Sequence, residues 1–185
     1  MMRKLTMPEL KRLSVVEFKK AAKCPVVVVL DNIRSQNNVG SVFRTADAFR
    51  LQGICLCGIT STPPHREIHK TALGATESVD WHYYKNTVDA ITWLRSEGYT
   101  ILALEQTDSG IALHEMHPEP GQKLAIVFGN EVHGINDSVL KTVDRCIEIP
   151  QFGTKHSLNV SVSVGIVIWD LFTKIKNFST DATLS

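Results

Sequence analysis

The sequence has no long hydrophobic run. Its longest uninterrupted apolar segments, residues 26–30 and 124–128, have five residues each, whereas a membrane-spanning helix needs about 20. The N-terminus carries no positively charged start followed by a long apolar stretch, so it does not have the pattern of a secretory signal. We therefore expect neither a membrane span nor export of the chain.

Cysteine pairs and metal-ligand clusters are also missing. The cysteines are Cys24, Cys55, Cys57 and Cys146. They form no Cys-x-x-Cys pair, which disfavours a zinc knuckle or a redox motif, and we expect free thiols in a reducing cytoplasm. Two histidine pairs have a spacing suited to a helix, His65 with His69 and His114 with His117. No carboxylate or thiolate completes a ligand set beside either pair, so no metal site is expected.

The chain has almost no net charge, but the charge is unevenly distributed. A net charge of +1 and a pI of about 7.7 argue against a wholly basic nucleic-acid-binding domain. Residues 1–23 carry seven basic and two acidic side chains, a net charge of +5, and the remaining 162 residues carry −4. This basic segment could bind phosphate groups, although a solvated helix face explains the charge equally well.

The length of 185 residues and the apolar fraction of 43% indicate one globular domain. Two capping-box patterns, one at Thr6 and one at Ser14, predict a short basic helical arm over residues 1–23. Pro25 ends this arm. The domain itself is expected over residues 24–176, followed by a frayed tail at 177–185.

Within the domain, strand and helix patterns alternate. Apolar or β-branched runs predict strands at 26–30, 53–59, 100–104, 123–128 and 145–149. Helical spacing predicts helices at 39–49, 87–97 and 136–143, and residues 60–69 form a polar stretch between elements. Strands that alternate with helices predict an α/β fold with a mostly parallel sheet flanked by helices.

One segment fits two patterns. Apolar residues from Leu158 to Ile168 alternate as in a strand, yet Leu158, Val162 and Trp169 also fall on one helical stripe. The segment is longer than an ordinary strand, and Ser157 is a suitable N-cap residue. We therefore predict a helix that begins after Ser157.

Parallel sheets bind ligands beyond the carboxyl ends of their strands, and three polar loops follow predicted strands, at 31–40, 129–134 and 150–159. None of them matches a known nucleotide-binding motif. The sequence has no Gly-x-Gly-x-x-Gly, and the segment from Gly129 to Gly134 lacks the Lys-Ser/Thr of a phosphate-binding loop. An enzyme that uses NAD or ATP is therefore disfavoured, and the glycines suggest a small ligand held by main-chain groups.

The three loops resemble the three signature motifs of the SpoU, or TrmH, family of RNA ribose methyltransferases. The first motif, Asn-x-Gly-x3-Arg-Thr-Ala, matches Asn38 to Ala46. The second, Gly-x-Glu-x2-Gly, matches Gly129 to Gly134, and the third, Ile-Pro-x2-Gly-x3-Ser-Leu-Asn-Val-Ser, matches Ile149 to Ser161. Each motif is weak alone, but all three occur in order over residues 25–175.

The resemblance implies a fold and an activity. It implies a deep C-terminal trefoil knot that binds S-adenosyl-L-methionine, although general rules of chain connection disfavour knots. It also implies methylation of a ribose 2′-hydroxyl in structured RNA, tRNA before rRNA, by a cytoplasmic homodimer that needs no metal. Two alternatives stay open: a catalytically silent RNA-binding homologue, and a nucleotide-binding α/β enzyme unrelated to RNA.

The resemblance also assigns roles to residues of this chain. The cofactor pocket would be lined by Leu104, Gly129, Ile149, Ser157 and Leu158. The catalytic group would comprise Arg44, Asn38, Glu131, Ser157 and Asn159. A guanidinium does not lose its proton in proteins, so Arg44 is expected to bind phosphate and the developing alkoxide rather than to act as a base.

Ordinary structural explanations compete with these roles. A lone Leu or Ile is usually a core residue, the glycines suit turns, and Arg44 could pair with Asp47 on a helix surface. His156 stands where relatives often carry an acidic residue and offers an imidazole for proton handling or a phosphate contact. The basic residues expected to contact RNA are Arg34, Arg66, Lys70 and Lys155, together with the arm.

Overall fold

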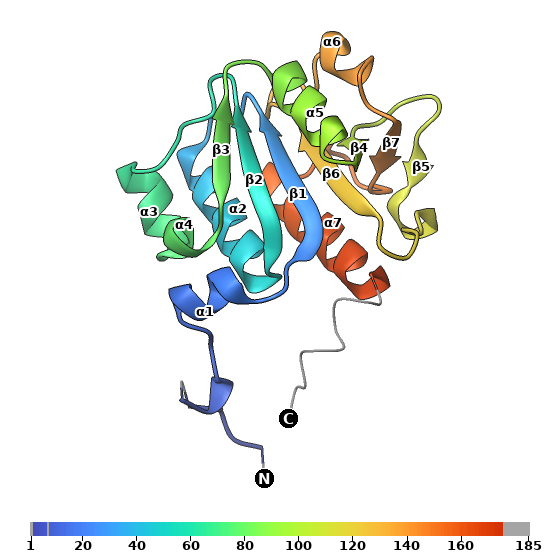
Figure 1. The fold of residues 1–185 in the computed structure, drawn as a ribbon. Coiled ribbons are helices and arrows are strands. Elements are labelled where there is room, and N and C mark those ends of the chain that lie inside the picture. The colour runs from blue at the N-terminus through green and yellow to red at the C-terminus, as the bar shows by residue number, and fades with distance from the viewer. Residues whose placement is uncertain (1, 7, 176–185) are drawn as a thin grey trace.

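The structure is a computed structural model that describes residues 2–6 and 8–175, and its centre is a sheet of seven strands. The strands are β1 (Cys24–Asp31), β2 (Leu51–Cys57), β3 (Trp81–Tyr84), β4 (Tyr99–Leu104), β5 (Ile111–Ala112), β6 (Lys123–Phe128) and β7 (Arg145–Glu148). Their order is β3-β2-β1-β6-β4-β7-β5, and every pairing between these strands is parallel (Figure 1). The predicted α/β fold with a mostly parallel sheet is confirmed.

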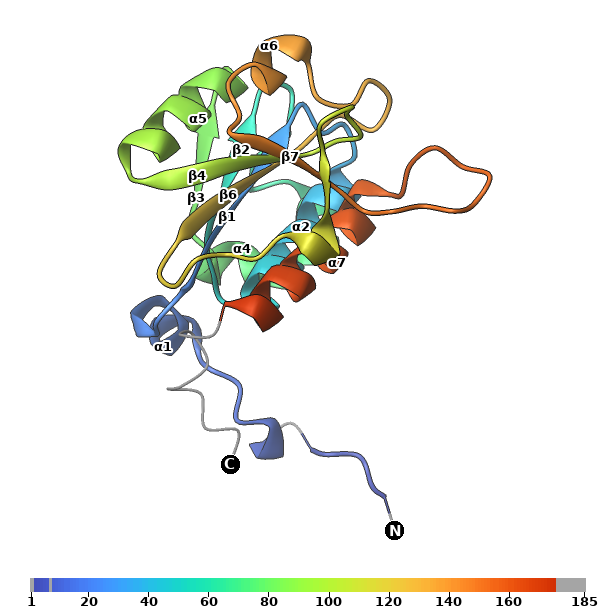
Figure 2. The same ribbon diagram turned by 90° about the vertical axis from the view of Figure 1, so that its right-hand side faces the viewer.

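Helices cover both faces of the sheet. They are α1 (Val15–Lys20), α2 (Gln36–Ala48), α3 (Arg66–Ala72), α4 (Ala75–Ser78), α5 (Thr87–Ser96), α6 (Asp137–Leu140) and α7 (Val160–Lys174), with short 3-10 turns at Pro8–Leu10 and Leu113–Glu115. The helices α2 and α7 lie on one face, and α5 lies on the other (Figures 1 and 2). None of the helices in the described ranges is long and apolar enough to cross a membrane.

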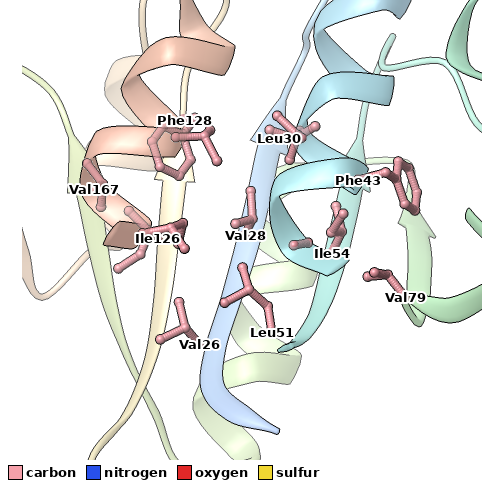
Figure 3. Packing of buried hydrophobic residues seen from close by; sticks show 14 of the residues in the cluster. Val26, Val28, Leu30, Phe43, Leu51, Ile54, Val79, Ile126, Phe128 and Val167 are labelled. Atoms are coloured by element: carbon pink, nitrogen blue, oxygen red, sulfur yellow. The ribbon is translucent and has the colours of Figure 1, made fainter. Parts of the chain in front are cut away.

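Burial along β1 explains why its sequence is apolar without interruption. Val26, Val28 and Leu30 belong to the hydrophobic cluster beneath α2 and α7 (Figure 3). Val27 and Val29 point to the other face and join the cluster beneath α5. A strand that is buried on both faces reads as a continuous apolar run, as this one does. The central position of β1 places the loop after Asp31 in the middle of the carboxyl edge.

The segment with two patterns is a helix, α7, but its N-cap differs from our prediction. The cap is Asn159, whose side-chain oxygen accepts a hydrogen bond from the N–H of Ser161 at 2.9 Å. The predicted cap, Ser157, lies two residues earlier in the exposed loop. Asparagine and serine are equally good caps, so local chemistry could not choose between them. The helix buries Val164 and Leu171 and leaves Trp169 exposed.

The N-terminal segment has less helix than its capping boxes predict. The box at Ser14 is complete and begins α1, whereas the one at Thr6 precedes only a 3-10 turn. Phe18 anchors α1 in the core at 5% exposure, and both ribbon views show the chain before α1 extending away from the sheet (Figures 1 and 2). The division into arm and domain stays a prediction, and the tail predicted at 177–185 lies outside the described residues.

Some elements were not predicted. The helix α3 begins at Arg66, inside the polar stretch 60–69, where His65 accepts a hydrogen bond from the N–H of Glu67. The strands β3 and β5 were also missed, because they have only four and two residues and are partly exposed. The trefoil knot implied by the family resemblance stays a prediction.

Candidate active site

A cavity lies at the carboxyl ends of β4, β6 and β7. Its volume is about 630 Å³. It contains every residue that the resemblance assigns to the cofactor pocket and three of those assigned to the catalytic group: Leu104, Gly129, Glu131, Ile149, Ser157, Leu158 and Asn159. The loop between β7 and α7 projects from the body of the molecule (Figure 2). It carries Ile149, Ser157, Leu158 and Asn159. The parallel strands therefore bring the second and third motifs to one site.

Two glycines allow the backbone to pack closely in this cavity. A Cβ atom on Gly129 would collide with the backbone of Gly134 and Ile135. Gly134 has a φ of +65°, which disfavours other residues, and a Cβ there would lie 2.6 Å from a carboxylate oxygen of Glu105. That carboxylate accepts hydrogen bonds from the N–H groups of Ile135 at 3.0 Å and Gln106 at 3.1 Å. Glu105 thus holds the glycine turn against the end of β4.

The cavity wall also contains an unsatisfied polar atom. The hydroxyl oxygen of Thr107 is buried and has no hydrogen-bond partner among the described residues, and Thr107 lines the cavity. A buried hydroxyl without a partner costs about 1 to 3 kcal/mol. Such groups are rare in native proteins and call for an explanation. A polar ligand in the cavity would supply the missing partner.

The three motifs meet through side-chain hydrogen bonds at the edge of the cavity. Asn38, in the first turn of α2, donates to a carboxylate oxygen of Glu131 at 3.2 Å. The side-chain amide of Asn159 donates to the side-chain oxygen of Asn38 at 3.3 Å. One residue from each motif therefore forms a continuous chain, which we call the Asn38–Glu131–Asn159 junction.

Glu131 is held as a carboxylate. Its partial burial acts to raise its pKa, but hydrogen bonds from the N–H of Arg34, from its own N–H and from the N–H of Ser35 and the amide of Asn38 outweigh burial and lower the pKa. The backbone nitrogens of Arg34 and Ser35 lie 2.9 and 3.1 Å from the carboxylate oxygens of Glu131. With both oxygens occupied by donors, Glu131 organises the loop after β1 and is poorly suited to accept a proton.

Asn130 connects the loops that follow β1 and β6. Its side-chain amide donates to the carbonyl oxygen of Asn32 at 2.7 Å. Its side-chain oxygen accepts hydrogen bonds from the N–H groups of Val132 at 2.9 Å and His133 at 3.1 Å. Asn130 is thus a positioning residue that we did not predict, although its place between Gly129 and Glu131 in the second motif was a signal.

Arg44 does not line this cavity. It lies on α2, its side chain is exposed, and it has no hydrogen bond or ion pair with any described residue. Asp47, the ion-pair partner in the competing structural explanation, instead accepts a hydrogen bond from Ser78 at 2.5 Å. The guanidinium is therefore free to meet a ligand, but the cavity in its own chain lies beyond the N-terminal end of its helix.

The side chains expected to contact RNA are all exposed. Arg34 precedes α2 and Arg66 begins α3. Lys70 lies 3.9 Å from Glu67, a surface ion pair that contributes little stability, and Lys155 lies on the projecting loop. Over the described ranges, no cluster of three or more His, Cys, Asp or Glu side chains could hold a metal ion, and the four cysteines are free thiols.

Several cavity residues were missed because the motifs do not contain them. Glu105, Gln106 and Thr107 follow directly after β4, so the rule that ligands bind beyond strand ends could have indicated them. Phe152, on the projecting loop, does not line the cavity but is 97% exposed, and no sequence signal separates it from a core phenylalanine.

Comparison with known proteins identifies relatives over most of the chain. A model of the SpoU rRNA Methylase family matches residues 25–169. A tRNA (guanosine(18)-2′-O)-methyltransferase of Borreliella burgdorferi is 31% identical over 157 residues, which cover 85% of this chain and 70% of the relative.

Two solved structures are similar. The AdoMet-bound rRNA methyltransferase of Sinorhizobium meliloti is 26% identical with a TM-score of 0.74, over 83% of this chain and 58% of the other. The TrmH/SpoU tRNA modifying enzyme of A. aeolicus has the same TM-score at 23% identity, over 85% and 78% of the two chains, and supports the fold. This chain spans 66% or less of several other curated relatives.

Proposed function

The chain belongs to the SpoU rRNA Methylase family, and from that premise we propose that it is an S-adenosyl-L-methionine-dependent methyltransferase that modifies a ribose 2′-hydroxyl in structured RNA. The observation that carries this proposal is the Asn38–Glu131–Asn159 junction, which unites the three motifs at the edge of a cavity. A set of motif residues that merely stabilised the core would have no reason to gather around an open cavity.

The cavity suits the proposed cofactor. Leu104, Ile149 and Leu158 provide apolar surface for the adenine ring, and the backbone around Gly129 can approach a ligand closely. The unpartnered hydroxyl of Thr107 offers a hydrogen bond to a polar group. When bound, S-adenosylmethionine supplies an electrophilic methyl group. The residues of this chain hold that cofactor, exclude water and orient the RNA.

The catalytic roles follow from the chemistry of each side chain. Asn38 and Asn159 hold amide groups at the cavity edge, where they can orient a ribose hydroxyl. Ser157 forms no hydrogen bond within the described structure, so its hydroxyl is available to a ligand. The guanidinium of Arg44 can bind phosphate and stabilise negative charge on the attacking oxygen.

We propose that the enzyme is a homodimer in which the two subunits complete each other's sites. An apolar stripe on α7 is open to solvent: Val162, Ile166 and Trp169 are 50%, 38% and 58% exposed. Large exposed apolar patches mark interaction surfaces. Trp169 lies beside Phe49 at the end of α2, with ring centroids 6.0 Å apart, so the stripe adjoins the helix that carries Arg44. A second copy on this face would bring Arg44 close to the partner's cavity.

The substrate is proposed to be tRNA before rRNA, in the cytoplasm. The exposed Arg34 and Lys155 lie on the loops beside the cavity, and Arg66 and Lys70 lie on α3, where they could contact the phosphate backbone. The basic arm adds a net charge of +5 at residues 1–23. Contacts of this kind position RNA without reading its sequence.

The activity is tested by incubating the protein with a methyl-labelled cofactor and bulk tRNA or rRNA, followed by mapping of alkali-resistant dinucleotides. We expect label in tRNA at one ribose position. If wild-type protein labels no RNA pool, the proposed activity is wrong. Arg44→Ala should bind both RNA and cofactor but transfer label at least about 100-fold more slowly. Equal rates for this variant and the wild type would remove Arg44 from the catalytic group.

A further inference from the structure

A second cavity lies at the opposite end of the sheet. Its volume is about 590 Å³, and it occupies the face that carries α5, near the amino ends of β1, β2 and β4. In Figure 1 this is the part of the sheet between α5 and α1. Its floor includes Val27 and Cys55, which are buried. The two cavities share no lining residue.

Aromatic rings form the walls of this cavity. They belong to His82, Trp93 and Tyr99, and Trp81 also borders the cavity although it packs against the cluster beneath α2 and α7. The rings of His82 and Trp93 have centroids 5.6 Å apart, and Trp93 remains 39% exposed although it is a large aromatic residue. Unpaired RNA bases are bound by stacking on such rings, and a cavity of this volume accommodates a nucleotide.

The charged groups at the rim fit the remaining parts of a nucleotide. Two ammonium groups, Lys19 and Lys123, line the cavity together with three carboxylates, Glu77, Asp80 and Glu97. Ammonium groups bind phosphate, and carboxylates accept hydrogen bonds from the amino groups of bases. Lys123 already donates a hydrogen bond to the carbonyl oxygen of Glu97 at 3.1 Å, but an apolar ligand would bury the other four charges without new partners. The combination of rings with both signs of charge therefore favours a nucleotide.

The basic segment leads to this cavity. Lys19 lines it from α1, and Lys20 and Lys23 follow within four positions. Phe18 holds α1 against the body, so Lys19 is fixed at the cavity, whereas the ammonium of Lys23 donates a hydrogen bond to the carbonyl oxygen of Phe18 and lies over its ring. An RNA backbone that follows the basic segment passes the cavity before it reaches the carboxyl edge of the sheet.

We propose that this cavity binds one unpaired nucleotide of the RNA substrate, at a site separate from the cavity beside the ribose to be methylated. The proposal rests on the proposed function for the identity of the polymer, and it adds a remote recognition site to it. Binding at two separated points would require a folded RNA of suitable shape, whereas a short single strand around the target ribose would not span both.

The first test measures affinity for bulk tRNA with full-length variants. Trp93→Leu removes the ring, and we expect the dissociation constant for tRNA to rise about 5- to 30-fold while the affinity for S-adenosylmethionine is unchanged. Trp93→Phe should retain most of the affinity, because it keeps a stacking surface. The matched control is Tyr83→Leu, since Tyr83 is 50% exposed on the same strand as His82 but does not line the cavity.

The second test is ultraviolet cross-linking of wild-type protein to tRNA, with mass spectrometry of the linked peptides. We expect a linked nucleotide on peptides that contain Trp81 or Trp93, besides any at the first cavity. Unchanged tRNA affinity in Trp93→Leu, or cross-links confined to the first cavity, would overturn the proposal. Cross-linking needs no methyl transfer, so an inactive wild type would refute the proposed function without deciding this inference.

Discussion

The side-chain amide of Asn159 donates a hydrogen bond to the side-chain oxygen of Asn38 at 3.3 Å, across 121 positions of the sequence. Asn38 in turn donates to Glu131, so both asparagine orientations depend on one carboxylate. Residues that share a hydrogen-bond network have non-additive mutational effects. The junction is therefore expected to behave as one functional unit.

Replacing both asparagines tests this coupling. Asn38→Ala and Asn159→Ala should each lower kcat about tenfold, which corresponds to the loss of one well-placed hydrogen bond. The kcat of the double variant should lie only slightly below that of the less active single variant. Asn37→Ala is the matched control, because Asn37 is exposed on the same helix turn and its side chain forms no hydrogen bond with the described residues. If the double variant instead lost single-turnover rate by the product of the two single-variant factors, the coupling would be wrong.

Glu131 predicts a pH dependence of stability. Its folded-state pKa is below the ordinary value of 4.5, so its carboxylate stabilises the fold fully above that value, and this contribution disappears as the pH falls through the folded-state pKa. Glu131→Gln lacks the titrating group. The difference in free energy of unfolding between wild type and Glu131→Gln should therefore be constant near neutral pH and shrink below pH 4.5. Urea unfolding at several pH values measures it, and a constant difference at all pH values would refute the assignment.

Thr107 predicts opposite changes in stability and binding. Thr107→Val removes a buried hydroxyl that has no partner, so the free energy of unfolding should rise by up to about 1 kcal/mol. If the hydroxyl serves the cofactor, affinity for S-adenosylmethionine should fall about fivefold or more. Thr107→Ser keeps the hydroxyl and should retain the affinity. Calorimetric titration decides the point, and unchanged affinity in Thr107→Val would show that the hydroxyl has no role in binding.

The exposed stripe on α7 predicts the oligomeric state. Trp169→Glu places a charge in the apolar stripe, and a charge buried there without a partner would prevent association. We expect sedimentation to show a dimer for wild type and a monomer for this variant. Leu73→Asp is the control, because Leu73 is the 66% exposed C-cap residue of α3 and does not belong to the stripe on α7. A monomeric wild type, or a dimeric Trp169→Glu, would argue against this interface.

Sequence patterns predicted the longer strands where one local rule applied, whereas the cavity residues came from the family resemblance and their roles stay predictions. Leu104 ends β4, and Gly129 and Ile149 directly follow β6 and β7, so parallel strands bring these three residues to one edge of the sheet. The edge strand β3 escaped detection because four half-exposed residues carry no clear period. The position of α7 relative to α2 depends on tertiary packing.

Tertiary packing also explains what remained hidden in the site. Arg44 belongs to the same motif as Asn38 and lies on the same helix, yet only Asn38 forms hydrogen bonds with residues that line the cavity of its own chain, Glu131 and Asn159. Six residues of helix separate them by about 9 Å along the helix axis, and the motif does not record this separation. The lack of a partner for the hydroxyl of Thr107 likewise depends on atomic contacts that no residue pattern encodes.

Mixed dimers test whether Arg44 acts on the partner's cavity. Arg44→Ala has an intact cavity, and Asn159→Ala has an intact arginine, so the first variant alone should keep about a hundredth of the wild-type rate and the second about a tenth. After unfolding and refolding an equal mixture, half of the dimers contain one chain of each kind, and one of their two sites is complete if the arginine comes from the other subunit. Activity should then recover to about a quarter of the wild-type rate. If Arg44 served its own chain, no site in any dimer would be complete, and the mixture would stay as inactive as its components. Refolded wild type gives the reference rate for this comparison.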